Sequence, residues 1–373
     1  MLGPSLSLGK ISGIPLRLHW SFFLFLLWVG LTQVYIAGNI GAALMGVVFI
    51  AAIFVCVVLH ELGHCLAARH YGIRTNHITL SPLGGIAALD ESPRTWKEEF
   101  WVAAAGPAVN VAICALLLPW LWLNPVSLDV LAQPTASLDA FIAKLFIGNM
   151  VMVIFNLLPA FPMDGGRILR SLLESQKDRE TATKIAARIG QGFAVFFALT
   201  GLFSSFVLVL IGIFIFLAAE GEYRMVRSRK RLDGITVGQL MGTRFEIVPD
   251  THTIFDVLGL KARSGQQHFP VARDGRIVAL LDRSSIGRAV VKNDLYASIS
   301  DYAISDYAMA TPGDDIISAE ELMVKTGQMA LPVFEAGKLI GMIDVSAIAA
   351  CREFPMREVL LKQRDSLKEN RKV

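Results

Sequence analysis

Long apolar segments alternate with short charged ones over roughly the first 220 residues of the chain. Most of these segments approach the roughly 20 residues that an α-helix needs to cross the hydrocarbon core of a bilayer. The pattern therefore predicts six transmembrane helices, of which the last two form either a tight hairpin or one long kinked element. The predicted spans are approximately Leu18 to Ile36, Gly41 to Ala68, Phe100 to Leu123, Ala140 to Leu158, Ile185 to Leu202 and Ser205 to Ala219.

A different pattern begins after the basic run at residues 224–231. Two stretches, approximately Thr236 to Val291 and Ser298 to Ala350, each contain a helical segment followed by strand, turn and strand. Such duplication predicts a tandem α/β repeat. We therefore expect a membrane domain at 1–223, a basic linker at 224–235, a repeat pair at 236–352 with copies at 236–291 and 298–350, and a charged tail at 353–373.

Composition agrees with this division of the chain. Hydrophobic residues make up 54% of the sequence and charged residues only 18%, and the mean hydropathy is +0.52. The hydrophobic share and the mean hydropathy are higher, and the charged share is lower, than in soluble globular proteins, so we expect a polytopic α-helical membrane protein with a soluble C-terminal α/β part. The net charge of +3 is small, and basic residues form no stripe interleaved with aromatic ones. We expect no nucleic-acid partner.

Lysine and arginine residues gather in alternate loops of the membrane domain. They lie before the first span, between the second and third, between the fourth and fifth, and after the sixth, whereas the opposite loops contain none. Because loops rich in Lys and Arg remain on the cytoplasmic side, this asymmetry predicts that the N-terminus and the repeat pair are cytoplasmic. It also places the C-terminal ends of the second and fourth spans together on the cytoplasmic side of the membrane.

An H-E-x-x-H motif lies inside the second predicted span, as His60-Glu61-Leu62-Gly63-His64. Residues four apart share a helix face, so His60 and His64 can present two imidazole nitrogens to one metal ion, with Glu61 near enough to act on a water molecule. A chance match on a surface helix is the alternative. Burying two histidines and a glutamate in hydrocarbon is costly unless they are paired or ligated, which favours a metal site.

Asp164 is the natural third ligand, because a catalytic zinc site usually has three protein ligands. It stands alone in the run from Pro159 to Gly166, directly after the fourth predicted span. The prolines end the helix, and Gly165 and Gly166 permit unusual backbone angles that would turn the carboxylate back toward a metal. The alternative is that Asp164 caps a helix starting at Gly165.

The residues from His77 to Leu89 alternate between apolar and polar and contain a Pro-Leu-Gly-Gly turn, which predicts a β-hairpin. Its free edge would hold an unwound substrate segment extended in a protease, or the hairpin would simply re-enter and cover the site. The two alternatives are equally supported. Gly84 and Gly85 are therefore candidate substrate-binding residues.

Three amide side chains lie in apolar surroundings, namely Asn110, which follows Gly106-Pro107 in the third span, and Asn149 and Asn156 in the fourth. Intramembrane asparagines usually join helices through hydrogen bonds. Contact with the backbone of a substrate is the other possibility, especially for Asn156, which is close to Asp164 in the sequence. We retain all three as candidate substrate-binding residues.

Together, His60 to His64, Gly106-Pro107-x-x-Asn110 and the run from Asn156 to Arg167 resemble the site-2 protease family of intramembrane zinc metalloproteases, peptidase family M50, in its branch with six spans and C-terminal CBS domains. The resemblance covers approximately Ile14 to Glu220. It implies one zinc ion held by His60, His64 and Asp164, with Glu61 as the catalytic base. It also implies single-pass transmembrane proteins as substrates, cleaved within the bilayer in regulated intramembrane proteolysis.

The repeat pair is similar to tandem CBS domains, in which a cleft often binds an adenine nucleotide. Here the usual Thr is replaced by Asp282 and Asp344, and the usual ribose-binding Asp by Ser285 and Ala347. These departures count against nucleotide binding and leave the CBS ligand unknown. Homodimerisation or substrate docking is an equal alternative.

Two other classes of function compete with the peptidase. One is a CBS-regulated channel or transporter in which the His-Glu-His cluster handles ions, and the other is a catalytically inactive membrane scaffold. Replacing Glu61 by glutamine separates the three, because only a peptidase would retain its zinc and lose cleavage.

Overall fold

The computed structural model describes residues 5–37, 40–82, 84–90, 92–127 and 137–354. Contacts divide the chain into two compact units, Met1–Arg224 and Met225–Val373. The expected C-terminal tail lies outside the described residues from position 355 onward.

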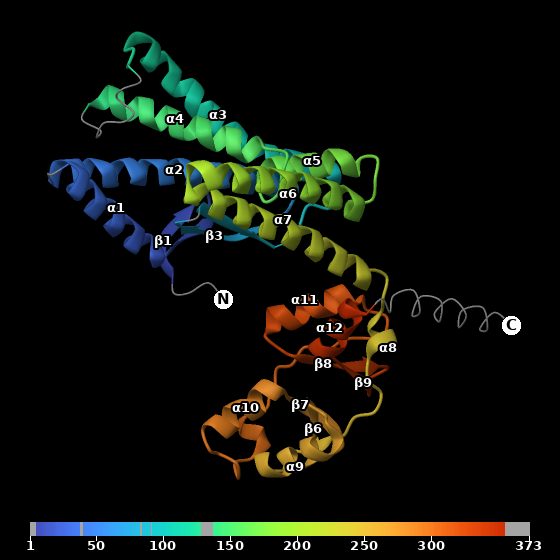
Figure 1. The fold of residues 1–373 in the computed structure, drawn as a ribbon. Helices are drawn as coiled ribbons and strands as arrows, with labels where there is room; N and C mark the ends of the chain where they lie inside the picture. Colours follow the sequence, from blue (N-terminus) through green and yellow to red (C-terminus); the bar gives the residue numbers. More distant parts are fainter. Residues whose placement is uncertain (1–4, 38–39, 83, 91, 128–136, 355–373) are drawn as a thin grey trace. The chain divides into compact units, whose positions relative to one another are not determined.

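The first unit is built mainly from long apolar helices (Figure 1). Among the described residues, five helices are long and apolar enough to cross a membrane, and a sixth, α1, has 17 residues. The first expected span is thus shorter than predicted, because residues 14–19 form a strand instead. The helices are α1 Ser21–Ala37, α2 Ile40–His70, α3 Trp96–Leu123, α4 Leu138–Leu157, α5 Asp164–Glu174, α6 Arg179–Ser204 and α7 Phe206–Leu232.

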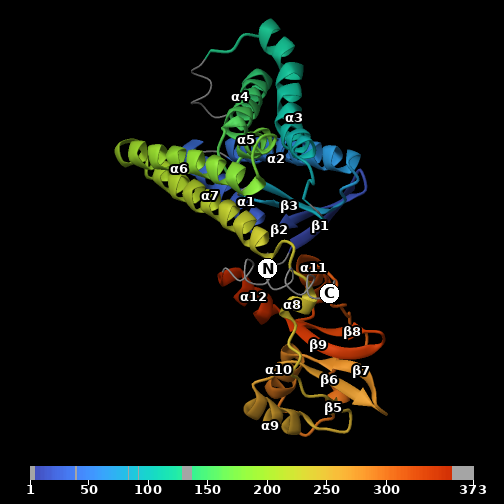
Figure 2. The ribbon, with the colours of Figure 1, turned by 90° about the vertical axis from the view of Figure 1, so that its right-hand side faces the viewer.

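Polar caps and close backbone approaches explain where these helices begin and how two of them pair. Helix α3 begins after Thr95, and α6 begins after Asp178. Each of these side chains accepts a hydrogen bond from a backbone N–H in the first turn. Helices α6 and α7 lie side by side (Figures 1 and 2). A Cβ on Gly212 would lie 2.6 Å from the carbonyl oxygen of Ala194. The last two spans therefore form the tight hairpin rather than one kinked element.

A four-stranded sheet accompanies the helices, with the strand order β1-β2-β3-β4. Strand β2 is parallel to β3, and the other two pairs are antiparallel, so β4 forms an edge. The β3–β4 hairpin confirms the alternation seen in the sequence. The strands are β1 Ser5–Ile11, β2 Ile14–His19, β3 Thr75–Ser81 and β4 Gly84–Leu89.

Strands β1 and β2 form a hairpin that the sequence reasoning missed. Ser12 and Gly13 connect them, and both have positive φ, 52° and 84°, as a two-residue type I′ turn requires. Alternation at Ile14, Leu16 and Leu18 was the available signal. These three side chains are buried against residues of α1 and α2 in one hydrophobic cluster, which holds the sheet next to the helix that carries the H-E-x-x-H motif.

The second unit is the expected tandem repeat. In each copy a helix precedes two antiparallel strands and another helix follows, and the strands are joined at Asp274-Gly275 or Ala336-Gly337, where all four residues have positive φ. Each copy has its own hydrophobic core. The elements are α8 Val237–Leu240, β5 Val248–Pro249, α9 Ile254–Ser264, β6 Phe269–Arg273, β7 Arg276–Leu281, α10 Arg283–Val291, the 3-10 helix η2 Ile299–Asp301, α11 Ile316–Thr326, β8 Ala330–Glu335, β9 Lys338–Asp344 and α12 Val345–Glu353.

Candidate metal centre and active site

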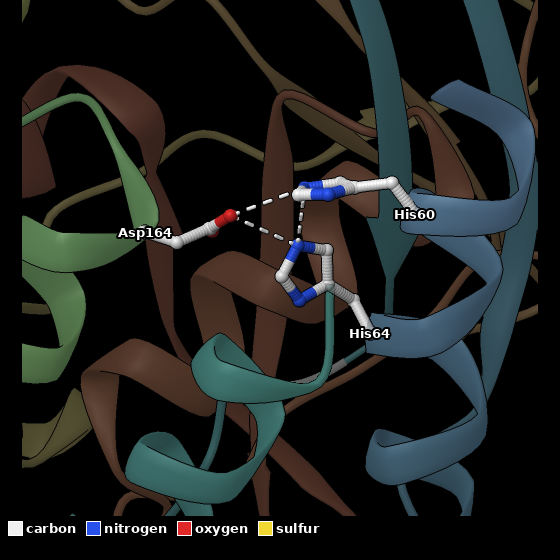
Figure 3. A group of neighbouring side chains, drawn as sticks. All are labelled: His60, His64 and Asp164. Carbon is white, nitrogen blue, oxygen red and sulfur yellow. Dashed lines mark hydrogen bonds and ion pairs between the residues drawn. The ribbon is translucent and has the colours of Figure 1, made fainter. Parts of the chain in front are cut away.

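Three potential metal ligands from two distant parts of the chain converge in the first unit. The Nε2 atoms of His60 and His64 on α2 lie 3.1 Å apart, and Oδ2 of Asp164 lies 3.1 Å and 3.2 Å from them. Figure 3 shows the carboxylate facing both imidazoles from the opposite side. The three residues are only 4%, 6% and 8% exposed. Sequence reasoning thus selected three side chains that the fold brings together.

The spacing of these atoms fits a zinc ion. Zinc bonds of roughly 2.0–2.1 Å in a tetrahedral arrangement place neighbouring ligand atoms about 3.3 Å apart. The three atoms form a nearly equilateral triangle of almost this size. Two imidazoles and one carboxylate are also a usual donor set for a catalytic zinc site, which leaves a fourth position for water or substrate.

Hydrogen bonds on the far side of each imidazole orient the two histidines. His60 donates from Nδ1 to Oδ1 of Asn110 at 2.5 Å, and His64 donates from Nδ1 to the carbonyl oxygen of Val102 at 2.7 Å. With the proton on Nδ1, the lone pair of each Nε2 is free to face the metal. Helix α3 therefore sets the tautomer of both ligands.

Asn110 and Asn149 have a different role from the substrate binding expected for them. Both are fully buried. Asn110 donates to Asn149 at 2.8 Å, and Asn149 donates to the carbonyl oxygen of Leu145 at 2.8 Å. Because their polar atoms are engaged inside the protein, these amides position His60 and have no surface to offer a substrate. Asn156 is half-buried, so it stays a candidate for substrate contact.

Gly106 on α3 makes room for the metal centre. A Cβ at this position would lie 2.2 Å from Nε2 of His64 and 2.8 Å from Nε2 of His60. In the sequence, the Gly106-Pro107 pair was noted only as part of the Gly106-Pro107-x-x-Asn110 motif. In the structure, Gly106 has a steric role, because it leaves room for the two imidazoles. The sequence offered one sign of this role: Gly106 lies four residues before Asn110 and therefore on the same helix face.

The segment around Asp164 corrects two expectations. Asp164 is the first residue of α5, and the cap position belongs to Met163, so the capping alternative is wrong. Neither Gly165 nor Gly166 has a positive φ. Instead, a Cβ on Gly165 would lie 2.2 Å from the carbonyl oxygen of Leu158. The glycines allow close packing of α5 on the preceding loop. The other carboxylate oxygen of Asp164 pairs with Arg167 at 3.8 Å.

Strand β4 lies directly against Glu61. A Cβ on Gly85 would be 2.5 Å from Cγ and 3.1 Å from Oε1 of Glu61. Gly84 has a φ of +123°, and a Cβ there would meet nothing within 4 Å. The free edge of the sheet and the proposed catalytic base are therefore neighbours.

Comparison with known proteins agrees with this geometry. The sequence model of peptidase family M50 matches residues 48–126 and 122–199, and that of the CBS domain matches residues 299–352. A zinc metalloprotease of Methanocaldococcus jannaschii is 32% identical over 345 residues, which cover 92% of this chain and 95% of that protein. The chain belongs to peptidase family M50.

Two further likenesses cover smaller parts of this M50 peptidase. Stage IV sporulation protein FB of Bacillus subtilis is 29% identical over 228 residues, 58% of this chain and 69% of that protein. The solved structure of a site-2 protease from Methanocaldococcus jannaschii is 37% identical and covers 59% of this chain and 95% of that one, with a TM-score of 0.44.

Family membership and the described helices together define the class of the protein. This M50 peptidase is an integral membrane zinc metalloendopeptidase of the site-2 protease type, with a C-terminal CBS region. It carries one cluster of metal-binding side chains within the part of the chain that the structure describes, namely His60, His64 and Asp164. Membership favours a peptidase over the transporter and scaffold alternatives.

The CBS region of this M50 peptidase has a cleft of ≈ 710 Å³ lined by residues of both copies, among them Arg244, His268 and Asp344. Asp344 accepts a hydrogen bond from the backbone N–H of Ala347 at 2.8 Å, and Asp282 accepts one from Ser285 at 2.7 Å. The two aspartates that replace the usual Thr thus cap helices α12 and α10. That no adenine nucleotide binds in the cleft stays a prediction.

Proposed function

We propose that this M50 peptidase hydrolyses peptide bonds within the transmembrane segments of single-pass membrane proteins, in regulated intramembrane proteolysis. The observation that carries the proposal is the convergence of His60, His64 and Asp164 next to Glu61, within a bundle of helices able to cross a membrane. A buried hydrolytic site of this kind suits substrates that reach it through the bilayer.

Each residue of the site has a distinct role in the proposed mechanism. His60, His64 and Asp164 would hold the zinc ion, and Asn110 and the carbonyl oxygen of Val102 keep the imidazoles oriented. Zinc, when bound, supplies a Lewis acid that lowers the pKa of water to about 7 and polarises a peptide carbonyl. Glu61 takes the proton from the attacking water and delivers it to the leaving amine nitrogen.

A substrate helix must unwind before its peptide bonds can react, because its carbonyl and amide groups are bonded to each other. The free edge of β4 offers replacement hydrogen bonds to an extended segment. Since Gly85 brings this edge against Glu61, a segment paired there would present its backbone close to the base. The same contact also suits a hairpin that only covers the site. Asn156 is proposed to contact the substrate backbone.

We also propose the topology and domain limits that the sequence predicts. The N-terminus and the CBS pair are cytoplasmic, in keeping with the distribution of Lys and Arg. The membrane domain comprises 1–223, the basic linker 224–235 and the CBS pair 236–352. The first part of this linker is helical, because α7 continues to Leu232.

The CBS pair is proposed to modulate the peptidase. Its cleft is large enough for a small ligand, and docking of a substrate or formation of a homodimer are further roles for the same region.

Co-expression with candidate single-pass proteins tests the proposed activity. We expect wild type to generate a shorter substrate fragment, and Glu61→Gln to retain one zinc per chain while producing none. Gly192→Ala is the control, since a Cβ there would meet nothing within 4 Å. Equal cleavage by wild type and Glu61→Gln would refute Glu61 as the base. Intact substrate with altered ion flux would favour the transporter.

A further inference from the structure

Arg170 on α5 connects the helix that carries Asp164 with two other helices. Its Nε donates to Oε1 of Glu99 on α3 at 2.9 Å, and its Nη1 lies 3.6 Å from Oε2 of Glu222 on α7. Glu99 is fully buried, and Arg170 is 6% exposed. Charges buried to this degree are held in place by their partners, because separation would leave one of them uncompensated. Helix α5 is thereby tied to both α3 and α7.

The loop that precedes Asp164 is anchored at the same place. The guanidinium carbon of Arg170 lies 5.0 Å from the ring centre of Phe161, which is 1% exposed. Phe161 packs with Ala186 of α6 and Ala219 of α7. Phe161 precedes Asp164 by only three residues, so the position of the carboxylate depends on the surface that the α6–α7 hairpin presents.

Helix α7 is also the link to the CBS region. Ala219 and Glu222 lie three residues apart, and therefore on one face of the helix. The same helix continues without a break to Leu232, which is fully buried in the hydrophobic core of the second CBS copy.

We propose that Glu222 is a positioning residue for Asp164, acting through Arg170 and Phe161, and that α7 transmits changes in the CBS pair to the metal centre by this contact. The second part rests on the proposed modulation by the CBS pair. A rotation or shift of α7 moves Ala219 and Glu222 together. Ala219 contacts Phe161 and Glu222 contacts Arg170, and these two residues hold α5 in position. Such a motion therefore displaces one zinc ligand, Asp164, while His60 and His64 stay fixed by α3.

Glu222→Gln in the full-length protein tests the positioning role, with Glu220→Gln as the matched control. Glu220 lies on the same helix but pairs with Arg224 at 2.8 Å and Gln191 at 3.0 Å, not with α5. We expect Glu222→Gln to raise the zinc dissociation constant by about 10-fold, the lower end for loss of a residue that supports a ligand. The absorption spectrum of the cobalt-substituted protein should also change, and kcat should fall with KM unchanged.

Glu222→Asp, which keeps the charge, should recover at least part of the loss. If Glu222→Gln and Glu220→Gln are indistinguishable in zinc affinity and cobalt spectrum, the positioning role is overturned.

A double-mutant cycle with Leu232→Ala tests transmission along α7. Leu232→Ala loosens the end of α7 from the CBS core, and we expect it to change zinc affinity in wild type but not in the Glu222→Gln background. Fully additive effects would overturn transmission through Glu222. If Leu232→Ala changes nothing in wild type while Glu222→Gln still weakens zinc binding, modulation by the CBS pair fails and the positioning role stands.

Discussion

Gly106 on α3 and His64 on α2 approach so closely that a Cβ on the glycine would lie 2.2 Å from the imidazole Nε2. The metal centre is therefore bounded on one side by bare backbone, and α3 contributes both this space and the acceptors that orient the histidines. The contact explains why α2 and α3 must pack at a specific register for the ligands to converge.

Gly106→Ala should abolish tight zinc binding, because the added methyl group occupies the space that the two imidazole nitrogens need. We expect a loss of about 100-fold or more in zinc affinity, at or beyond the upper range for disrupted ligand support. Chelator competition on the purified protein measures it. Gly192→Ala, at an open position of α6, is the control and should bind zinc normally. Normal zinc binding by Gly106→Ala would contradict the prediction, because it would mean that the imidazoles have room for the added methyl group.

Asn110→Ala should weaken zinc binding by about 10- to 100-fold, since the Nδ1–H of His60 loses its acceptor and the ring its orientation. It should also cost about 1–3 kcal/mol of stability, because a buried donor on His60 and a buried acceptor on Asn149 are left unsatisfied. Zinc titration and thermal unfolding provide the two measurements. Asn124→Ala, beyond the last turn of α3, is the control. A variant that binds zinc like wild type would show that Asn110 does not orient His60.

Gly85→Ala should separate zinc binding from catalysis. The new Cβ would lie 2.5 Å from Cγ of Glu61 and push the base aside, while His60, His64 and Asp164 are untouched. We expect zinc content to remain normal and kcat to fall by about 100-fold or more, within the range for loss of a general base. Fragment formation from a cleaved substrate, measured beside zinc content, checks this. Loss of zinc together with activity would contradict the separation.

Acid should destabilise the CBS region through His268. Burial lowers the pKa of this histidine from its ordinary value of 6.5, although Asp344 and Asp282 act in the opposite direction. The unfolded state therefore binds the proton more readily, and stability falls as the pH drops below about 6.5 until the lower folded-state pKa is passed.

Thermal unfolding of the full-length protein between pH 8 and about 5 measures this effect. His268→Gln removes the titrating group and should flatten the dependence. His252→Gln, at a half-buried position before α9, is the control. An unchanged pH profile in His268→Gln would assign the acid sensitivity to other groups.

Much of the local structure follows from short-range patterns. Apolar length predicted the long helices, alternation predicted the β3–β4 hairpin, and the duplicated strand-turn-strand motif predicted the tandem repeat. These features depend on residues that are close together in the chain, so they can be predicted from the sequence. The first helix was predicted to begin at Leu18, but it begins at Ser21, because Leu18 belongs to strand β2.

The metal ligands were predictable for a chemical reason. His60 and His64 share a helix face by their spacing, and a lone carboxylate among apolar residues needs a partner. Asp164 is 104 residues from His60 in the chain, yet the two side chains meet.

By itself, then, the amino-acid sequence determined the helices, the repeats and the chemical nature of the site. Only the tertiary structure decided that Asn110 supports His60, that Gly106 and Gly85 leave room for the side chains of the site, and that Glu222 reaches Arg170. The physical reason is distance along the chain. Such contacts join residues from different helices and strands, and which side chains meet depends on the register at which whole elements pack, a property that no local pattern contains.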